Sequence, residues 1–513
     1  MKRKAWAAAL VATAALGITP APANAQDEPR LETASIGWKP CSDDSKDSGD
    51  PGDLRGSVDP GDPGDSDVEC GTVTVPIDWS RPGGPKIDIA LARRRATEPA
   101  SRIGALLVNP GGPGGSGFND VRAGGMAKQF PAEVRRRFDI IGFDPRGVGR
   151  SHQIRCRPLT LRPEDVFPVT TRQFRRLGET MRAHGESCRQ VSGPLFDFVD
   201  SASVARDMDA IREGLGEDTL NFYGNSYGTL LGQQYARLFP ERVRAMVLDS
   251  TMDHSRATTW DFLRSEAKAV QDGFDQYVAW CRRSTDCALH GKDVRRVFAE
   301  LRARAERGTL VDPRTSEPKT AFDLLADAQY AFFGPYWKSL SQDHAKMLAN
   351  RPRTSSTSRP VEKATREETV ENPSMPIFCQ DWRLPVRGAA EVRAYLRGLA
   401  RVAPDMRLPA QAWAATISCV GWPTATRVPQ EPPRWKGVPV LLINSRYDPA
   451  TPHEWARNVA RQSGAALLTY DGWGHGVYSL GSACAAAATE RYLLSLRTPP
   501  PGSRCPAVEP RAE

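Results

Sequence analysis

One stretch of the sequence constrains the fold more than any other: Thr219-Leu-Asn-Phe-Tyr-Gly-Asn-Ser-Tyr-Gly-Thr-Leu230. Its residues 220–223 form an apolar and aromatic run of the kind that makes a buried strand. Gly-Asn-Ser-Tyr-Gly follows at once, and apolar side chains then recur at helical spacing from Leu230 to Leu238. The stretch therefore predicts a strand, a tight turn and a helix in direct succession.

A turn this tight needs small residues on both sides of its apex. Gly224 and Gly228 stand two positions before and two positions after Ser226. This is the G-x-S-x-G pattern of a nucleophile elbow, which holds a serine hydroxyl above the edge of a sheet. The same pattern also arises by chance in glycine-rich loops, and the chain has 43 glycines. The strand and helix on either side favour Ser226 as a nucleophile.

Short apolar strands alternate with helices on both sides of this turn. The first two strands read as an antiparallel pair, and the later alternation indicates a mostly parallel sheet with helices on both faces. Between residues 251 and 433 the pattern changes to successive helices with no convincing strand, as expected for a lid inserted between sheet strands. Strands are expected at 71–79, 87–92, 104–108, 138–143, 220–223, 245–249, 438–443 and 465–469, and helices at 201–215, 260–282, 294–307, 321–348 and 390–402.

The same patterns divide the 513 residues into segments. An N-terminal extension, 26–70, contains a stretch rich in Asp, Gly, Ser and Pro at 42–67, where we expect a loop. Residues 71–250 form the first part of the sheet core, residues 251–433 the lid, and residues 434–513 the second part of the core with a cysteine-bearing tail.

The N-terminus has the features of a secretory signal peptide. Lys2, Arg3 and Lys4 carry positive charge, residues 5–18 are apolar, and Ala23-Asn-Ala25 is an A-x-A cleavage site. We therefore expect residues 1–25 to be removed and the protein to be secreted, extracellular or associated with the cell wall. No later stretch is long and apolar enough to span a bilayer.

Export gives the ten cysteines a role, because disulfides persist outside the cytosol. We predict that neighbours in sequence pair, although sequence alone does not fix the connectivity. A zinc site is the alternative, but the chain has no C-x-x-C motif and no histidine at ligand spacing. We expect neither a metal nor a cofactor. The cysteines are Cys41, Cys70, Cys156, Cys188, Cys281, Cys287, Cys379, Cys419, Cys484 and Cys505.

A net charge of +8 is spread along the chain without a concentrated basic patch. Such a distribution is typical of a solvated surface, and no nucleic-acid-binding motif accompanies it. We therefore expect no nucleic-acid partner. The sequence does not indicate the oligomeric state.

A serine nucleophile needs a base, and the base needs a group that orients it. In a parallel sheet such residues follow strands directly. His475 stands between two glycines after the strand at 465–469, and Asp448 follows the strand at 438–443. Ser226, Asp448 and His475 also occur in the chain order expected for this elbow. Asp249 is the alternative acid, although a carboxylate that caps a loop is the more probable role for it.

In this triad His475 would take the proton of Ser226, and Asp448 would fix the imidazole tautomer. The oxyanion needs backbone donors, and we predict the N–H groups of Tyr227 and Gly112. Gly112 lies in a loop with very little side chain, residues 109–117, which lets backbone approach a ligand closely. Arg146 is expected to have a structural role, tying active-site loops together.

Together these residues resemble the α/β-hydrolase fold peptidases related to prolyl aminopeptidase, and most closely the secreted bacterial tripeptidyl aminopeptidases. Pro110 stands where prolyl aminopeptidases have a histidine, which leaves the backbone donors intact. The resemblance covers most of the chain after Gly71, including the tail from Cys484 to Cys505. It rests on Asn109-Pro-Gly-Gly-Pro-Gly-Gly-Ser-Gly117, Gly142-Phe-Asp-Pro-Arg-Gly-Val-Gly-Arg-Ser151, Gly224-Asn-Ser-Tyr-Gly-Thr229, Asp448-Pro-Ala-Thr-Pro452 and Gly474-His-Gly476.

The resemblance implies a secreted serine exopeptidase that acts on peptides with a free N-terminus and releases tripeptides through an acyl-enzyme. Such an enzyme must recognise the α-ammonium at a fixed distance from the serine, which calls for carboxylates in the lid. Asp381 is the first candidate and Glu371 the second, although both could be ordinary lid charges. The aromatic run 330–337 could line the substrate pocket, but packing within the lid is its more probable use.

Two other function classes fit the same residues. A lipase or esterase has the same triad, and a non-catalytic binding protein can share the fold. The intact order of Ser226, Asp448 and His475 disfavours the binding protein. Epoxide hydrolases and dehalogenases are disfavoured because their elbow carries an aspartate where this chain has Ser226.

Overall fold

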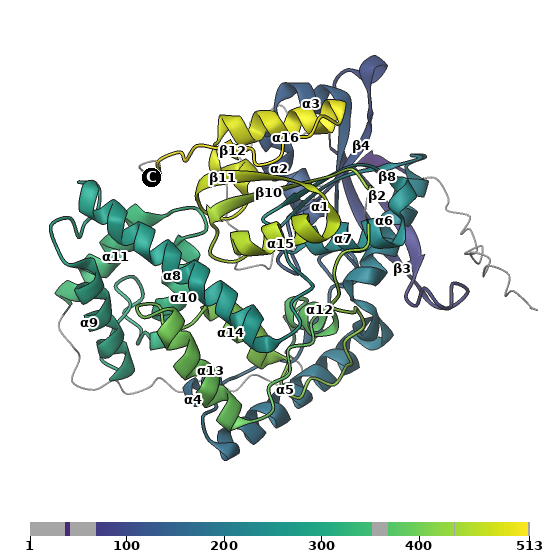
Figure 1. The fold of residues 1–513 in the computed structure, drawn as a ribbon. Helices are drawn as coiled ribbons and strands as arrows, with labels where there is room; N and C mark the ends of the chain where they lie inside the picture. The colour runs from purple at the N-terminus through teal and green to yellow at the C-terminus, as the bar shows by residue number, and fades with distance from the viewer. Residues whose placement is uncertain (1–35, 42–67, 351–367, 436, 511–513) are drawn as a thin grey trace, which may run out of the picture. The chain divides into compact units, whose positions relative to one another are not determined.

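The structure is a computed structural model that describes residues 36–41, 68–350, 368–435 and 437–510. The predicted signal peptide, 1–25, and the acidic stretch, 42–67, lie outside the described residues. Within the described chain, a ten-stranded sheet is the central element (Figure 1).

The strands of this sheet run in the order β1-β2-β3-β5-β4-β7-β8-β10-β11-β12. Strands β1, β2 and β3 pair antiparallel with their neighbours, and every pair from β5 to β12 is parallel. The expected antiparallel start and parallel core are therefore confirmed. The strands are β1 (Lys39–Pro40), β2 (Val68–Pro76), β3 (Lys86–Arg94), β4 (Gly104–Asn109), β5 (Phe138–Phe143), β7 (Leu220–Asn225), β8 (Val243–Asp249), β10 (Val440–Tyr447), β11 (Ala466–Trp473) and β12 (Arg504–Cys505).

Helices bury both faces of the sheet. On β4, Leu106 and Val108 pack in one apolar cluster, while Leu107 between them packs in another, because side chains alternate along a strand. The first cluster includes side chains of α1 (Gly117–Arg122), α2 (Gly125–Gln129), α3 (Ala132–Arg137) and α16 (Ala483–Ser495). The second includes those of α6 (Ser201–Gly214), α7 (Gly228–Leu238) and α15 (His453–Ser463).

Between β8 and β10 the regular elements of the described chain are mostly helices, which gather together in Figure 1. The strand β9 (Val370–Glu371), which the sequence did not indicate, also lies here and pairs with β6 (Arg155–Cys156). The helices are α8 (Thr259–Arg283), α9 (Val294–Glu306), α10 (Ala321–Ala331), α11 (Trp337–Ala349), α12 (Ser374–Asp381), α13 (Ala389–Val402) and α14 (Ala410–Ser418).

One expected helix is two. The prediction of a continuous helix over 321–348 is wrong, because α10 ends at Ala331 and α11 begins at Trp337. Gly334 and Pro335 lie in the connection; proline lacks the N–H that a helix interior needs and disfavours helical geometry in the residue before it. The break turns the aromatic residues of this connection out of a regular helix.

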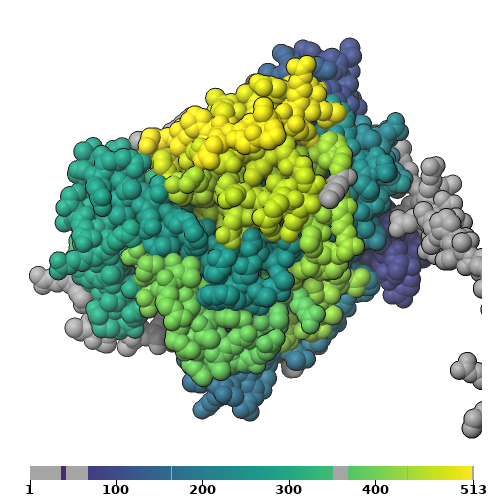
Figure 2. Space-filling view, in the orientation of Figure 1, coloured from purple at the N-terminus to yellow at the C-terminus, as the bar shows by residue number. Residues whose placement is uncertain are grey.

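Two further helices, α4 (Pro163–Val166) and α5 (Thr171–Ser192), precede the elbow. The indole N–H of Trp413 on α14 donates to the carbonyl of Val166 on α4, at 2.8 Å, so this region packs against the helices that follow β8. At the other end of the helical region, Arg283 on α8 pairs with Glu509, at 2.9 Å. Figure 2 shows the C-terminal part of the chain, in yellow, directly beside this teal helical region.

Five disulfides join the ten cysteines, and each bridge joins neighbours in sequence, as predicted. Cys379–Cys419 links α12 to the C-terminal cap of α14, and Cys484–Cys505 ties α16 to β12. The other bridges are Cys41–Cys70, Cys156–Cys188 and Cys281–Cys287. Among the residues that the structure describes, no helix combines the length and apolarity needed to cross a bilayer.

Candidate active site

The backbone at the apex of the elbow has the strained conformation that the G-x-S-x-G pattern predicts. Ser226 lies between β7 and α7 with φ 56°, a left-handed conformation that costs an ordinary residue roughly 1 kcal/mol or more. A Cβ added at Gly224 would lie 2.5 Å from the Gly228 carbonyl oxygen, and one at Gly228 would lie 2.7 Å from that of Asn109. Glycine is therefore required at both positions, and Ser226 is held at the end of β7 with its side chain half-buried.

The glycine-rich loop after β4 packs directly on this turn. A Cβ at Gly111 would lie 2.5 Å from the Asn225 carbonyl oxygen and 2.8 Å from the Tyr227 nitrogen. Gly111 and Gly112 have φ of 93° and 113°, which side-chain-bearing residues rarely adopt. Within the described residues, the N–H groups of Gly112 and Tyr227 donate to no protein acceptor. Both remain available to a ligand atom.

Asp249 at the end of β8 holds two loops. Its carbonyl accepts the N–H of Ser226, at 2.9 Å, and its carboxylate accepts the N–H groups of Val477 and Tyr478, at 2.8 and 2.9 Å. The Tyr223 hydroxyl donates to the same carboxylate, at 2.7 Å. Asp249 is thus the loop-capping carboxylate that the sequence favoured for it, and it fixes the elbow and the His475 loop to one strand end.

The imidazole of His475 faces Asp448. Nδ1 of His475 lies 3.0 Å from both carboxylate oxygens of Asp448, which is wholly buried. Asp448 also accepts the N–H groups of Ala450 and Thr451 and the Thr451 hydroxyl, at 2.8–2.9 Å. The turn after β10 therefore holds the Asp448 carboxylate against Nδ1 of His475. The other ring nitrogen, Nε2, is left for another partner.

Burial lowers the pKa of His475, but the charge of Asp448, its hydrogen bond and the charge of Asp249 outweigh that effect. The pKa of this imidazole is therefore raised above its usual 6.5. A base that binds a proton more readily than a free imidazole suits proton transfer from an alcohol.

Phe333, which the sequence did not single out, is the neighbour of His475 in the helical region. Its carbonyl accepts the His475 N–H, at 2.7 Å, and its ring meets the imidazole edge-to-face with centroids 5.0 Å apart. The glycine before His475 permits this approach, because a Cβ at Gly474 would lie 2.6 Å from the same carbonyl oxygen. The only sequence feature that pointed to Phe333 was the aromatic run 330–337.

The two carboxylates considered for amine recognition differ in setting. Asp381 is wholly buried; it accepts the N–H and hydroxyl of Ser201, at 2.8 and 2.9 Å, and the Tyr227 hydroxyl, at 2.6 Å. Burial and the charge of nearby Asp200 raise its pKa to about 7, against these hydrogen bonds. Glu371 is exposed on β9 and pairs with Arg155, at 3.2 Å.

Arg146 has the structural role expected of it. Its guanidinium is wholly buried and forms a bidentate pair with Asp207 on α6, at 2.6 Å. It also donates to the carbonyls of Pro76 at the end of β2, of Ile77 and of Phe198. It therefore ties the loop after β5 to the first strands and to α6.

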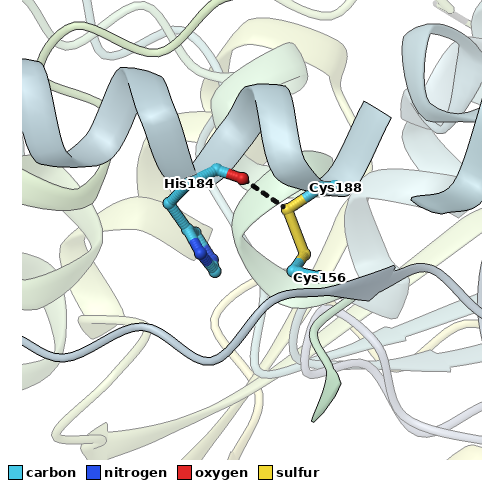
Figure 3. Close-up of side chains that lie close together, drawn as sticks. All are labelled: Cys156, His184 and Cys188. Atoms are coloured by element: carbon cyan, nitrogen blue, oxygen red, sulfur yellow. Dashed lines mark hydrogen bonds between the residues drawn. A yellow bond between two sulfur atoms is a disulfide. The ribbon is translucent and has the colours of Figure 1, made fainter. Parts of the chain in front are cut away.

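A cysteine–histidine cluster and a large cavity lie outside this site. Cys156, His184 and Cys188 gather where α5 meets β6, but the two sulfurs are bonded to each other and offer no thiolate to a metal (Figure 3). A cavity of about 1380 Å³ opens between α8, α15 and the C-terminal segment. Tyr447 and His453 line it, whereas Ser226 and His475 do not, so we assign it no part in the chemistry.

Comparison with known proteins gives consistent matches over most of the chain. The model of the alpha/beta hydrolase fold family matches residues 104–482. Serine protease Hip1 of Mycobacterium tuberculosis is 32% identical over 460 residues, which cover 85% of this chain and 87% of that protein. Tripeptidyl aminopeptidase of Streptomyces lividans is 32% identical over 475 residues (86% and 85%), and carboxylesterase B of M. tuberculosis is 32% identical over 467 residues (85% and 86%).

Proposed function

The chain belongs to the alpha/beta hydrolase fold family and is a serine hydrolase, and on that premise we propose that it is a secreted serine exopeptidase. It cleaves peptides near a free N-terminus and releases tripeptides. The buried Asp448–His475 pair, tied through Asp249 to the strained serine turn, is the observation that carries the proposal. The similarity to a protease and to a tripeptidyl aminopeptidase supports peptides as the substrate class.

In the proposed reaction the Ser226 hydroxyl attacks the scissile carbonyl while Nε2 of His475 takes its proton. The oxyanion receives hydrogen bonds from the N–H groups of Gly112 and Tyr227, each worth about 10²–10³ in rate. His475 then returns the proton to the leaving amine, and an ester of Ser226 with the N-terminal fragment remains. Water, activated by the same imidazole, hydrolyses this ester and frees the serine.

Recognition of the substrate α-ammonium is assigned to carboxylates, with Asp381 and Glu371 as the candidates. Glu371 is accessible, and an ammonium would compete with Arg155 for it. Asp381 is buried beneath Tyr227, so an amine would reach it only by displacing a hydroxyl partner. Either role would appear as a rise in KM for free-amino substrates in Glu371→Gln or Asp381→Asn.

The test of the nucleophile is Ser226→Ala. We expect kcat on a tripeptide reporter with a free N-terminus to fall by about 10⁶-fold, the loss typical of removing a serine nucleophile. Ser495→Ala, at the exposed end of α16, should retain wild-type kcat. Normal turnover by Ser226→Ala, or no labelling of the wild-type protein by a fluorophosphonate, would contradict the proposal and favour a binding protein.

An esterase is the second candidate, and the similarity to carboxylesterase B favours it. Comparing free tripeptide substrates, N-acetylated tripeptides and p-nitrophenyl esters separates the two. A peptidase of this kind should prefer the free amine. Turnover of esters alone would support the esterase. Equal turnover of free and N-acetylated peptides would show that the enzyme does not recognise the free amine.

Secretion rests on the N-terminal residues 1–25 and on the five disulfides, which persist in oxidising compartments. The exported protein should begin near Gln26, as N-terminal sequencing of the culture supernatant and cell-wall fraction would show.

A further inference from the structure

Three aromatic side chains form a continuous surface beside His475. Phe333 lies edge-to-face with His475, Tyr330 lies 6.0 Å from Phe333, and Tyr336 stacks on Tyr330 at 6.2 Å, all between ring centroids. We call Tyr330, Phe333 and Tyr336 the aromatic platform. It runs from the imidazole of the active site to the protein surface.

Two side chains of the platform are exposed to solvent, although large apolar side chains are usually buried. Tyr330 is 52% exposed and Tyr336 is 37% exposed, which places both among the few strongly exposed large apolar side chains of the described residues. Their neighbours Phe332 and Trp337, by contrast, are buried in the helical region. The aromatic run therefore divides into two parts, one that packs inward and one that lines the approach to His475.

The local backbone is shaped to hold this surface. The connection is closed by hydrogen bonds from the N–H of Phe333 to the Tyr330 carbonyl, at 2.9 Å, and from the N–H of Tyr336 to the Ala331 carbonyl, at 2.8 Å. A Cβ at Gly334 would collide with the ring of Tyr336. Glycine at this position thus lets the Tyr336 ring approach the backbone closely.

The chemistry of the proposed reaction determines which part of a substrate lies here. His475 must deliver a proton to the leaving nitrogen, so that atom comes within about 3 Å of Nε2. The oxyanion donors lie on the elbow and the glycine-rich loop, so the acyl carbon is held there. The chain that continues from the leaving nitrogen therefore passes along the surface next to the imidazole.

Resting on the proposed function, we propose that the aromatic platform binds the residue that follows the scissile bond and selects large apolar side chains there. Tyr330, Phe333 and Tyr336 are specificity-determining residues for the leaving group. An aromatic or aliphatic side chain would cover the exposed faces of Tyr330 and Tyr336, whereas glycine would leave them in water.

The test uses tetrapeptides with a free N-terminus, three constant residues and Phe, Leu, Gly or Asp at position four. We expect the wild-type kcat/KM to be about 4- to 12-fold higher for Phe and Leu than for Gly, the range for covering roughly half of one such side chain. In the double variant Tyr330→Ser/Tyr336→Ser this ratio should fall to about 1–2. Hydrolysis of the methyl ester of the same tripeptide, which lacks a leaving side chain, should change by less than about 2-fold.

Two further variants separate the platform from general effects on folding. Gly334→Ala displaces the Tyr336 ring without removing it and should reduce the same ratio. Tyr395→Ala removes a half-buried tyrosine on α13 that stacks on Trp260 of α8, outside the platform, and should leave the ratio unchanged.

The outcomes are distinct. If the wild-type protein cleaves none of these peptides, the peptidase proposal fails and the platform inference fails with it. If it cleaves them with equal kcat/KM, or if the double variant keeps the preference for Phe, the platform inference fails while the peptidase proposal stands. Loss of the preference in the double variant and in Gly334→Ala, with ester hydrolysis retained, supports it.

Discussion

At the scale of single residues, the proposed mechanism predicts how activity depends on pH. The proposed reaction needs a neutral His475 imidazole, and the pKa of His475 is raised by Asp448. Activity is therefore lost on the acid side, as pH falls through this raised pKa. In Asp448→Asn the charge is gone while burial remains, so the acid limb of kcat/KM should move to lower pH and kcat should fall about 10⁴-fold.

This prediction is checked by measuring kcat/KM between about pH 4 and about pH 9. Asp471→Asn is the matched control, because Asp471 on β11 pairs with Arg504 at the surface and does not face the imidazole. An acid limb that stays in place in Asp448→Asn would show that another group controls it.

The placement of Ser226, Asp448 and His475 at strand ends could be predicted, because each closely follows a strand in sequence. Their catalytic roles stay a prediction. The carboxyl ends of parallel strands share one edge, so position in sequence indicates position in space. The same reasoning made Asp249 the alternative acid, whereas its carboxylate in fact accepts the N–H groups of Val477 and Tyr478. Phe333 could not be identified, because its contact with His475 joins two regions far apart in sequence and depends on a helix break.

At the scale of elements, the elbow and the glycine-rich loop act as one packed unit. Gly228→Ala places a Cβ against the backbone of Asn109, and neither backbone segment can move without shifting β4 or β7. We expect a loss of about 1–3 kcal/mol in the free energy of unfolding and a larger relative loss of kcat. Chemical denaturation and steady-state kinetics measure both.

Gly83→Ala is the control, since a Cβ at Gly83 meets nothing within 4 Å. It should change the free energy of unfolding by less than about 0.5 kcal/mol. Equal effects of the two substitutions would mean that close packing at the elbow is not what glycine provides.

Helices with strong apolar periodicity, such as α8, were predicted correctly. Prediction failed where polar residues hid the periodicity or where a helix is interrupted. Helix α5 was not predicted, because its arginines and other polar residues obscure the few buried positions, such as Leu177 and Met181. The sequence predicts one helix over 321–348, because apolar residues keep helical spacing through Gly334 and Pro335. The backbone, however, is not helical at these two residues.

At the scale of the molecule, the disulfides restrain the helical region by different amounts. Cys379–Cys419 closes a sequence separation of 40 residues, and Cys281–Cys287 one of 6. Loop-closure entropy gives about 4 kcal/mol for the first and about 2 kcal/mol for the second. The double variant Cys379→Ala/Cys419→Ala should therefore lower Tm more than Cys281→Ala/Cys287→Ala, and the reverse order in calorimetry would contradict this.

The arrangement of the whole sheet was only partly open to prediction. The sequence indicated eight of the strands and that most are parallel, but not the short strands β1, β6, β9 and β12. It also did not indicate that β3 pairs with β5 rather than β4. Strand order depends on contacts between segments that are distant in sequence, and no local sequence pattern records such contacts.

The disulfides also bear on how the chain can be made. No bridge encloses or crosses another: the second cysteine of each pair precedes the first cysteine of the next. If the polypeptide enters an oxidising space N-terminus first, as secretion would require, the partner of the first cysteine of each pair is therefore the next cysteine to appear. Each disulfide can therefore form while the chain is still being translocated. No disulfide that forms early has to be broken and re-formed.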